Sequence, residues 1–392
     1  MIHSLLDQDL YKLTMLQVYF HRFRAVDHAE FRFHCRTAKV DLRHLKEPLT
    51  HQLKQLCRLR FRKKELAWLQ TLGLFQNDFI TFLRHFSLNM AHVFIGEENQ
   101  QLTIRFRGPL LAVCQFEVFT LAILNELHTR HTYPQPDYDS GRQRLDSKIN
   151  ALLKDPQTHG LTFADFGTRR RFNRNWQQVV LTTLKQRLPR HLSGTSNMVL
   201  ARELGLPAIG TMAHEFFQAC QVLAPTLEQS QRFALKVWFE EYSGKLGIAL
   251  SDVIGIEPFL RDFDTEMAQH YSGVRHDSGE PLAWAEKVLA HYRQLKIEPR
   301  KKTLVFSDGL TLQRAKDIYA RLHKHVGVTF GIGTHLTNDL GHPPLSIVIK
   351  MSRCCHQPVA KISDSPGKAW CEDQHFLQTL RNTFNLPTVG AG

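Results

Sequence analysis

A histidine followed directly by a glutamate lies in the segment LPAIGTMAHEFFQAC, residues 206–220. The apolar run and Gly-Thr pair before His214 predict a strand and a turn, and the residues after it have the pattern of a helix. Most of the 22 histidines in the chain must be structural, but an imidazole at a strand exit can act as a nucleophile when a neighbouring group orients its second nitrogen. Adjacent helical residues point in different directions, so Glu215 is a poor orienting group. We expect the orienting acid to come from another strand, with Glu240 and Asp252 as candidates.

Two further segments combine an acid with small residues. They are VRHDSGEP, residues 274–281, and FSDGL, residues 306–310. Either segment alone could be a turn before a helix. At successive strand ends, however, they would offer an arginine for an anion and acids for a ribose hydroxyl or a hydrated metal ion, which indicates a sugar-phosphate site. The candidate residues are Arg275, Asp277, Ser278, Asp308 and Gly309.

A glycine-rich turn occurs in FGIGTHLTND, residues 330–339. Backbone N–H groups around Gly331, Gly333 and Thr334 can form a nest for an anion, and a helix that begins here adds its partial positive charge. The segment is neither a GxGxxG sequence nor a Walker sequence, since Gly-Lys-Ser/Thr occurs nowhere in the chain. We expect the turn to bind a phosphate.

Four arginines occur in FGTRRRFNRNW, residues 166–176. A run of charges is most often a solvated face. Here the run follows a Gly-Thr pair at the exit of a predicted strand, where an arginine fork can hold a carboxylate or a phosphate through two parallel hydrogen bonds. Arg169 is the candidate of this group.

The elements that must position these residues are short apolar runs, most of them followed by helical sequence. Seven such runs end in LTFADFGTR, HLSGTSN, LPAIGTMAHE, LGIALSD, GVRHDSGE, TLVFSDGL and VTFGIGTHL. Strands that alternate with helices imply right-handed parallel crossovers. Seven units predict an α/β fold with an irregular parallel barrel, in which the chemistry lies at the carboxyl ends of the strands.

The chain outside the barrel predicts a second, sandwich-like α/β domain. Residues 1–20 and 51–90 have helical spacing, while HAEFRFHCRT and QLTIRFRG alternate as strands do. Residues 108–124 are expected to form a buried strand and helix. The tail, residues 345–368, predicts two strands with a turn near Gln357-Pro358 that pair back onto this domain.

We therefore place the amino-terminal domain at residues 1–130, joined by strands from residues 345–392, and the catalytic barrel at residues 131–344.

Composition narrows the class of protein. The formal net charge of +13 points to polyanionic partners, either nucleic acid or small phosphorylated molecules. The basic residues are spread along the chain without an aromatic–basic recognition module, so we expect no nucleic-acid partner. The seven cysteines form no CxxC pair and the first residues lack the pattern of a signal peptide, so we expect a cytoplasmic protein. The most apolar run contains Gln115 and Glu117 and is too short to span a bilayer, so no membrane partner is expected.

Taken together, these segments resemble the nicotinate phosphoribosyltransferase family over nearly the whole chain. The matching segments are HSLLDQDLYKLTM, FGTRRRF, GTSN, GTMAHE, VRHDSGEP, SDGL, FGIGTHLTND and PVAKISDSPGK. Their order and spacing make the resemblance specific. Glu280 stands where aspartate is expected in close relatives, which leaves the Arg and Asp of that segment in place. The family fold implied is an amino-terminal α/β domain with an irregular α/β barrel.

The resemblance implies ATP-coupled transfer of phosphoribosyl from 5-phosphoribosyl-1-diphosphate to nicotinate, giving nicotinate mononucleotide, diphosphate, ADP and phosphate in NAD biosynthesis. In the family the histidine of the GTxAHE segment is phosphorylated by ATP, which assigns that role to His214. The transfer passes through an oxocarbenium-like state, so diphosphate, ribose and ring nitrogen must be held in line. Mg²⁺ would bridge diphosphate oxygens and keep several waters, so no residue is expected to be a dedicated metal ligand.

The implied reaction gives roles to the phosphate- and sugar-binding candidates. Asp277 and Asp308 are expected to hold ribose hydroxyls or the waters of the metal, and the turn at residues 331–334 is expected to take the 5-phosphate. Arg275 is the first choice and Arg169 the second for the carboxylate of nicotinate.

Two other residues are expected beside the ring. Tyr11 would stack on the pyridine ring from a neighbouring subunit, because the family is commonly dimeric. Thr211 would hydrogen-bond the substrate beside His214.

Two other functions are compatible with the sequence. A sister transferase would use nicotinamide or quinolinate, which need fewer or more cations in the pocket than nicotinate does. A basic nucleic-acid-binding protein is a candidate of a different class, and its binding would fall steeply with salt.

Overall fold

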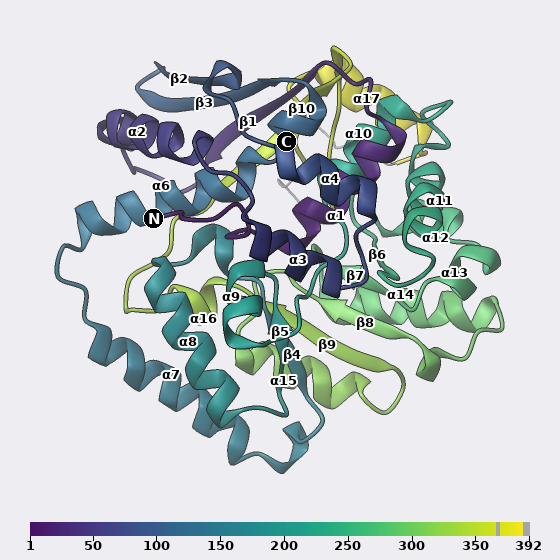
Figure 1. Ribbon diagram of the computed structural model, residues 1–392. Coiled ribbons are helices and arrows are strands. Elements are labelled where there is room, and N and C mark those ends of the chain that lie inside the picture. Colours follow the sequence, from purple (N-terminus) through teal and green to yellow (C-terminus); the bar gives the residue numbers. More distant parts are fainter. Residues whose placement is uncertain (366–368, 387–392) are drawn as a thin grey trace.

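Two β-sheets organise the protein, as seen in a computed structural model that describes residues 1–365 and 369–386 (Figure 1). The strands are β1 (Ala29–Cys35), β2 (Val93–Glu98), β3 (Gln101–Gly108), β4 (Thr162–Asp165), β5 (Leu192–Thr195), β6 (Ile248–Leu250), β7 (Gly273–His276), β8 (Thr303–Phe306), β9 (Gly327–Ile332), β10 (Ile347–Cys354) and β11 (Gln357–Pro358). One sheet has five antiparallel strands in the order β11-β10-β1-β3-β2. The other has six parallel strands in the order β5-β4-β9-β8-β7-β6. The protein is therefore of the α/β class, as predicted.

The antiparallel sheet joins the two ends of the chain. β10 pairs with β1 along its whole length, from Ala29 opposite Cys354 to Cys35 opposite Ile347. The tail thus returns to the first part of the chain. Its turn lies at Cys355-His356, where both residues have positive φ, and the predicted turn residues form β11 instead. The end of the quoted PVAKISDSPGK segment, residues 366–368, lies outside the described residues, and the domain boundaries stay a prediction.

The parallel sheet is built from buried apolar runs with helices around it. Six of the seven predicted barrel strands are present. The seventh, near Ala208, is reduced to a single parallel bridge with Thr195. Pro207 lies in this segment and has no N–H to donate to a ladder, which accounts for the short pairing. Closure of the barrel stays a prediction.

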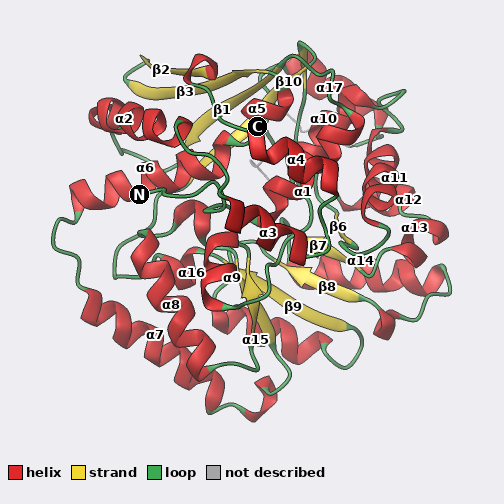
Figure 2. Ribbon diagram, in the orientation of Figure 1, coloured by secondary structure: helices red, strands yellow, loops and turns green. Residues whose placement is uncertain are grey.

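Helices cover both sheets (Figure 2). They are α1 (Leu10–Arg22), α2 (Lys46–Cys57), α3 (Lys63–Thr71), α4 (Asn77–His85), α5 (Leu110–Val113), α6 (Phe116–Thr132), α7 (Tyr138–Leu153), α8 (Arg174–Arg187), α9 (Met198–Leu204), α10 (His214–Leu223), α11 (Ser230–Tyr242), α12 (Ile256–Asp262), α13 (Thr265–His270), α14 (Pro281–Gln294), α15 (Leu312–Leu322), α16 (Thr334–Thr337) and α17 (Gln374–Thr383). Short 3-10 turns include η4 (Thr168–Arg170). The first helix begins at Leu10 rather than near residue 1. The side chains of the preceding residues bond to segments that follow the parallel strands, Asp7 to Arg171 and Asp9 to Ser196.

The most apolar stretch forms two helices, α5 and α6, and not the expected strand and helix; only Gly108 belongs to a strand. Leu110–Thr132 is long and apolar enough to cross a membrane by length and composition, but 83% of its most apolar window is buried inside the protein. This stretch is therefore the core helix of a folded domain in the structure, packed beside β10 and α2.

Candidate active site

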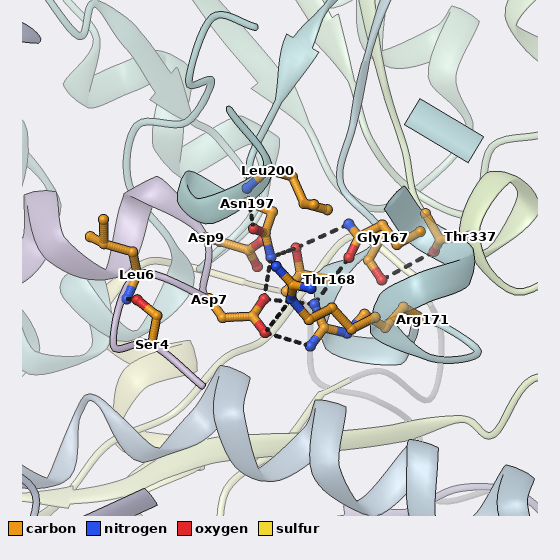
Figure 3. Close-up of polar contacts among 12 residues, drawn as sticks. Ser4, Leu6, Asp7, Asp9, Gly167, Thr168, Arg171, Asn197, Leu200 and Thr337 are labelled. Atoms are coloured by element: carbon orange, nitrogen blue, oxygen red, sulfur yellow. Dashed lines mark hydrogen bonds and ion pairs between the residues drawn. The ribbon is translucent and has the colours of Figure 1, made fainter. Parts of the chain in front are cut away.

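A buried ion pair fixes the segment before α1 onto the strand ends of the parallel sheet (Figure 3). Arg171 donates from Nη1 to Asp7 Oδ1 over 2.7 Å and from Nη2 to Asp7 Oδ2 over 2.8 Å, and both side chains are buried. Asn197 Nδ2 donates to the same carboxylate over 2.8 Å. Arg171 is therefore an anchor for the amino-terminal segment, and two arginines of the same run, Arg169 and Arg170, face a cavity.

That cavity has a volume of about 390 Å³ and lies at the carboxyl ends of the parallel strands. Eight of the residues predicted for the site line it: Tyr11, Arg169, His214, Arg275, Asp277, Gly309, Gly333 and Thr334. Tyr11 comes from the same chain, so the expectation that a neighbouring subunit supplies it is not needed to build the cavity. The structure thus brings together residues that are up to 323 positions apart (334 − 11 = 323).

His214 begins α10 and contacts two charged groups through one ring nitrogen. Its Nε2 lies 2.9 Å from Asp252 Oδ1 and 2.7 Å from Lys361 Nζ. Asp252 is buried, and its Oδ2 accepts from Ser278 Oγ over 2.6 Å and from Lys361 Nζ over 2.8 Å. Of the two candidate acids, Asp252 is therefore the one that orients His214, while Glu240 lies on α11 and pairs with Arg22.

Burial and the charge of Lys361 lower the pKa of His214, although Asp252 acts in the opposite direction. Burial alone would raise the pKa of Asp252, but the attraction of His214 and Lys361 holds it well below its ordinary value. At neutral pH the site therefore contains a neutral imidazole beside an ionised carboxylate. Nε2 cannot donate to Asp252 and accept from Lys361 at the same time. In the tautomer that donates from Nε2 to Asp252, Lys361 Nζ is held by Asp252 Oδ2 and the lone pair of the imidazole lies on Nδ1.

Replacing Lys361 by methionine is expected to change how the rate of His214 phosphorylation depends on pH. The acid limb of this profile, where the rate falls as the imidazole becomes protonated, should move to higher pH. Removing a positive neighbour stabilises the imidazolium, so the pKa of His214 rises towards 6.5. The measurement is the rate of label transfer from γ-labelled ATP between pH 5 and 8. Lys302→Met is the matched control, since Lys302 bonds Tyr271 O at the amino-terminal end of β8, away from the cavity, and is not among the charges that act on His214. An acid limb that stays in place in Lys361→Met would contradict this electrostatic role.

Arg275 reaches the cavity from β7. Its buried Nε has no hydrogen-bond partner among the described residues. In the same segment, Asp277 Oδ1 accepts from Ser307 Oγ over 2.6 Å, and Asp277 Oδ2 lies 3.6 Å from His214 Nε2. The site therefore contains the Arg275 guanidinium, whose Nε–H is available to a ligand, and the Asp277 carboxylate, which lies beside His214.

Of the two glycines expected to form the turn, Gly333 lies at the cavity, while Gly331 belongs to β9 and lies behind it. Gly333 lines the cavity, and a Cβ on it would lie 3.2 Å from Phe166 O. A Cβ on Gly331 would lie 2.3 Å from the ring of Phe166. The absence of a side chain at Gly331 therefore makes room for the ring of Phe166. Phe166 lines the cavity, whereas Gly331 does not.

Three further candidates lie outside the main cavity. Thr211 accepts a hydrogen bond at its backbone O from Thr14 Oγ1 over 2.7 Å. Ser278 holds Asp252, as described above. Asp308 lines a second cavity of about 180 Å³.

This second cavity is lined by charged groups of both signs. Arg36, Lys350 and Lys361 line it together with Glu117, Glu215 and Asp308, and Arg169, His214 and Asp277 line both cavities. Burial, with the charges of Arg36 and Lys361, lowers the pKa of Lys350 to about 7. An anion that enters the cavity would favour the charged form of this lysine.

Sequence reasoning missed several residues of the site. Phe166, Asp9 and Ser196 line the main cavity, and Phe166 could have been found because it directly precedes the Gly-Thr pair of the arginine segment. Lys361 lies in the quoted PVAKISDSPGK segment, but nothing in the spacing of that segment links it to Asp252, which is 109 positions away.

Comparisons with known proteins show the family of this chain. The model of the nicotinate phosphoribosyltransferase (NAPRTase) family matches residues 161–388, and the model of the NAPRTase N-terminal domain matches residues 6–125. The chain is 48% identical over 388 residues to nicotinate phosphoribosyltransferase of Bordetella pertussis, covering 98% of this chain and 96% of that protein.

Solved structures are similar over the same length. A crystal structure of nicotinate phosphoribosyltransferase from Vibrio cholerae aligns with a TM-score of 0.95 at 37% identity, covering 99% of this chain and 94% of that chain. The corresponding protein from Porphyromonas gingivalis aligns with a TM-score of 0.93 at 32% identity, covering 98% of this chain and 100% of that chain.

Proposed function

Because this chain belongs to the nicotinate phosphoribosyltransferase family, we propose that it transfers phosphoribosyl from 5-phosphoribosyl-1-diphosphate to nicotinate, forming nicotinate mononucleotide and diphosphate. The observation that carries the proposal is the single cavity in which Arg275, His214 and the glycine turn at Gly333 meet. Arg275 would bind a carboxylate, the glycine turn would bind a phosphate, and His214 is the reactive group in the same cavity.

Arg275 binds the carboxylate of nicotinate. Its buried Nε is without a partner among the described residues, and a planar guanidinium fits a planar carboxylate through two parallel hydrogen bonds. The aromatic rings of Phe166 and Tyr11 line the same cavity, and they supply apolar surface against the pyridine ring.

The phosphoribosyl group lies towards the glycine turn. Backbone N–H groups around Gly333 and Thr334 hold the 5-phosphate, and Asp277 holds a ribose hydroxyl or a metal-bound water. Asp308 does the same from the second cavity. In the transfer, the ring nitrogen of nicotinate forms the bond to the anomeric carbon and the bond to diphosphate breaks, so binding both in line lowers the barrier.

His214 couples the transfer to ATP. Its Nδ1 lone pair attacks the γ-phosphorus, the bond to the ADP oxygen breaks, and water later cleaves the phosphohistidine to phosphate. The cations of the second cavity, Arg36, Lys350 and Lys361, fit the phosphates of a nucleotide or of diphosphate. Asp252 stabilises the imidazole while the charge changes.

Mg²⁺ would neutralise charge on the diphosphate or triphosphate oxygens when bound. His214, Asp252 and Asp277 place ligand atoms within 4.8 Å of one another, but Lys361 and Ser278 already occupy Asp252 Oδ2. Asp277 is therefore the acid of this group that fits the hydrated ion, through its waters.

Replacing Gly333 by valine is expected to raise the KM for 5-phosphoribosyl-1-diphosphate roughly ten- to hundredfold, the loss expected when one hydrogen bond to a charged group is blocked. The side chain would prevent the phosphate from approaching the backbone. Phosphorylation of the histidine should survive in part, and initial rates at varied substrate concentration measure the change. An unchanged KM, or a phosphate bound in a crystal far from this turn, would contradict the assignment.

We also propose that the protein acts in the cytoplasm as a homodimer on small-molecule substrates. All seven cysteines lie in the described part of the chain and are free, which fits a reducing compartment. Sedimentation of the purified protein tests the dimer.

The activity itself is tested with labelled nicotinate, nicotinamide and quinolinate, each supplied with 5-phosphoribosyl-1-diphosphate and Mg²⁺. We expect a mononucleotide from nicotinate only. Faster conversion of nicotinamide or quinolinate would move the assignment to a sister transferase.

A further inference from the structure

A chain of ion pairs connects the main cavity to the first turn of α10, and the reaction described above does not use its two middle members. Arg169 Nη1 lies 3.0 Å from Glu117 Oε1. Lys12 Nζ lies 3.0 Å from Glu117 Oε2 and 2.6 Å from Glu215 Oε2. The side chain of Lys12 is fully buried, and those of Glu117 and Glu215 are 8% and 7% exposed.

Both ends of this charge chain are attached to the site. Arg169 lines both cavities, and Glu215 directly follows His214. Lys12, in the middle, directly follows Tyr11, which lines the main cavity. The charge chain is therefore continuous with backbone that carries site residues at Tyr11, Arg169 and His214.

α1 is also tied to the backbone that leads to His214. Thr14 Oγ1 donates to Thr211 O over 2.7 Å, and Ala213 N contacts Met15 Sδ at 3.4 Å. These contacts, with the ion pair between Lys12 and Glu215, make α1 and the start of α10 one packed unit.

The balance of charge in the chain depends on the state of His214. Two cations face two carboxyl groups, and burial with the nearby charge of Glu117 raises the pKa of Glu215 to about 7, although Lys12 acts in the opposite direction. A phosphoryl group on His214 adds negative charge next to Glu215, whose buried Oε1 has no hydrogen-bond partner among the described residues. Because this repulsion exists in only one of the two states, the charge chain has a different energy in each of them, which is what coupling between sites requires.

We infer that Lys12 and Glu117 are positioning residues that couple phosphorylation of His214 to the placement of Arg169 in the substrate cavity. The inference rests on the proposed function. The negative charge of the phosphoryl group repels the Glu215 carboxylate. The Lys12 ammonium then divides its attraction differently between Glu117 and Glu215, and this changes the strength of the ion pair between Glu117 and Arg169. Lys12 lines neither cavity, while Glu117 lines the second one beside Arg169; both act through Arg169 and the start of α10.

The test uses the full-length chain with Glu117→Gln, which keeps the shape and an acceptor oxygen but removes the charge. A second variant, Lys12→Met with Glu215→Gln, removes a cation and an anion together, so that no buried charge is left alone. Two quantities are measured: ATP hydrolysed per mononucleotide formed, and the ratio of the KM for nicotinate without ATP to that with ATP. Lys302→Met is the matched control, because Lys302 is a buried lysine at the opposite, amino-terminal end of β8.

We expect both variants to hydrolyse more ATP per product, and the KM ratio to fall about fivefold or more, the lower end of typical coupling between sites. Lys302→Met should leave both quantities unchanged even if it lowers the amount of active protein. A merely structural role would lower kcat alone, so an unchanged ATP-to-product ratio and KM ratio in both variants would overturn the inference. If one variant fails to fold, the other decides. Absence of product with the wild type would contradict the proposed function instead.

Discussion

Replacing His214 by asparagine is expected to abolish transfer of label from γ-labelled ATP to the protein, down to background. The imidazole is the nucleophile, and the amide of asparagine has no lone pair of comparable reactivity. Some mononucleotide should still form without any benefit from ATP, because the ribosyl transfer does not need the imidazole. In the wild type the label should be lost in acid and retained in base, as expected for a phosphoramidate.

His335→Asn is the matched control, since His335 lines the same main cavity beside the glycine turn. This variant should still take up label. Label in His214→Asn, or full stimulation of that variant by ATP, would return His214 to a structural role.

Replacing Arg275 by alanine is expected to raise the KM for nicotinate strongly. Removing one partner of a buried charged pair typically costs about 2–5 kcal/mol, which is roughly a 30-fold to several-thousand-fold change in affinity. The KM for ATP should change much less, because Arg275 lines the main cavity and not the second one. Steady-state rates with nicotinate varied at saturating co-substrates measure the effect.

Arg275→Lys separates charge from geometry. Lysine keeps the positive charge but cannot form the parallel pair of hydrogen bonds, so an intermediate KM is expected. An unchanged KM in Arg275→Ala would move the carboxylate-binding role to Arg169.

Much of the site could be predicted because strand ends repeat a visible pattern. In a parallel sheet the carboxyl ends lie at one edge, so His214, Arg275, Asp277 and the glycine turn were expected to meet, and they do. Asp252 was one of two acids proposed to orient His214. It follows β6, so the same rule about the carboxyl ends of parallel strands predicts that it lies near the histidine. The sequence predicts a full seventh strand around Pro207, because that apolar run has the same pattern as the other six, and it does not indicate that the run forms only a single bridge.

The rest depends on long-range packing that spacing does not encode. Arg169 and Arg171 are two positions apart and identical in type, yet one faces the cavities and the other is buried against Asp7. Lys361 reaches His214 only because β10 pairs with β1 and brings the tail over the site. The charge chain through Lys12 likewise joins three helices whose contacts form only in the folded protein.

The measurement that tests the central claim most directly is the extent of nicotinate mononucleotide formation at equilibrium, with and without ATP. An enzyme that only catalyses the ribosyl transfer cannot change the final ratio of product to substrate. If phosphorylation of His214 drives the transfer, ATP should raise that ratio while ADP accumulates with product, and His214→Asn should show the ratio of the ATP-free reaction. An equal ratio with and without ATP in the wild type would contradict the account.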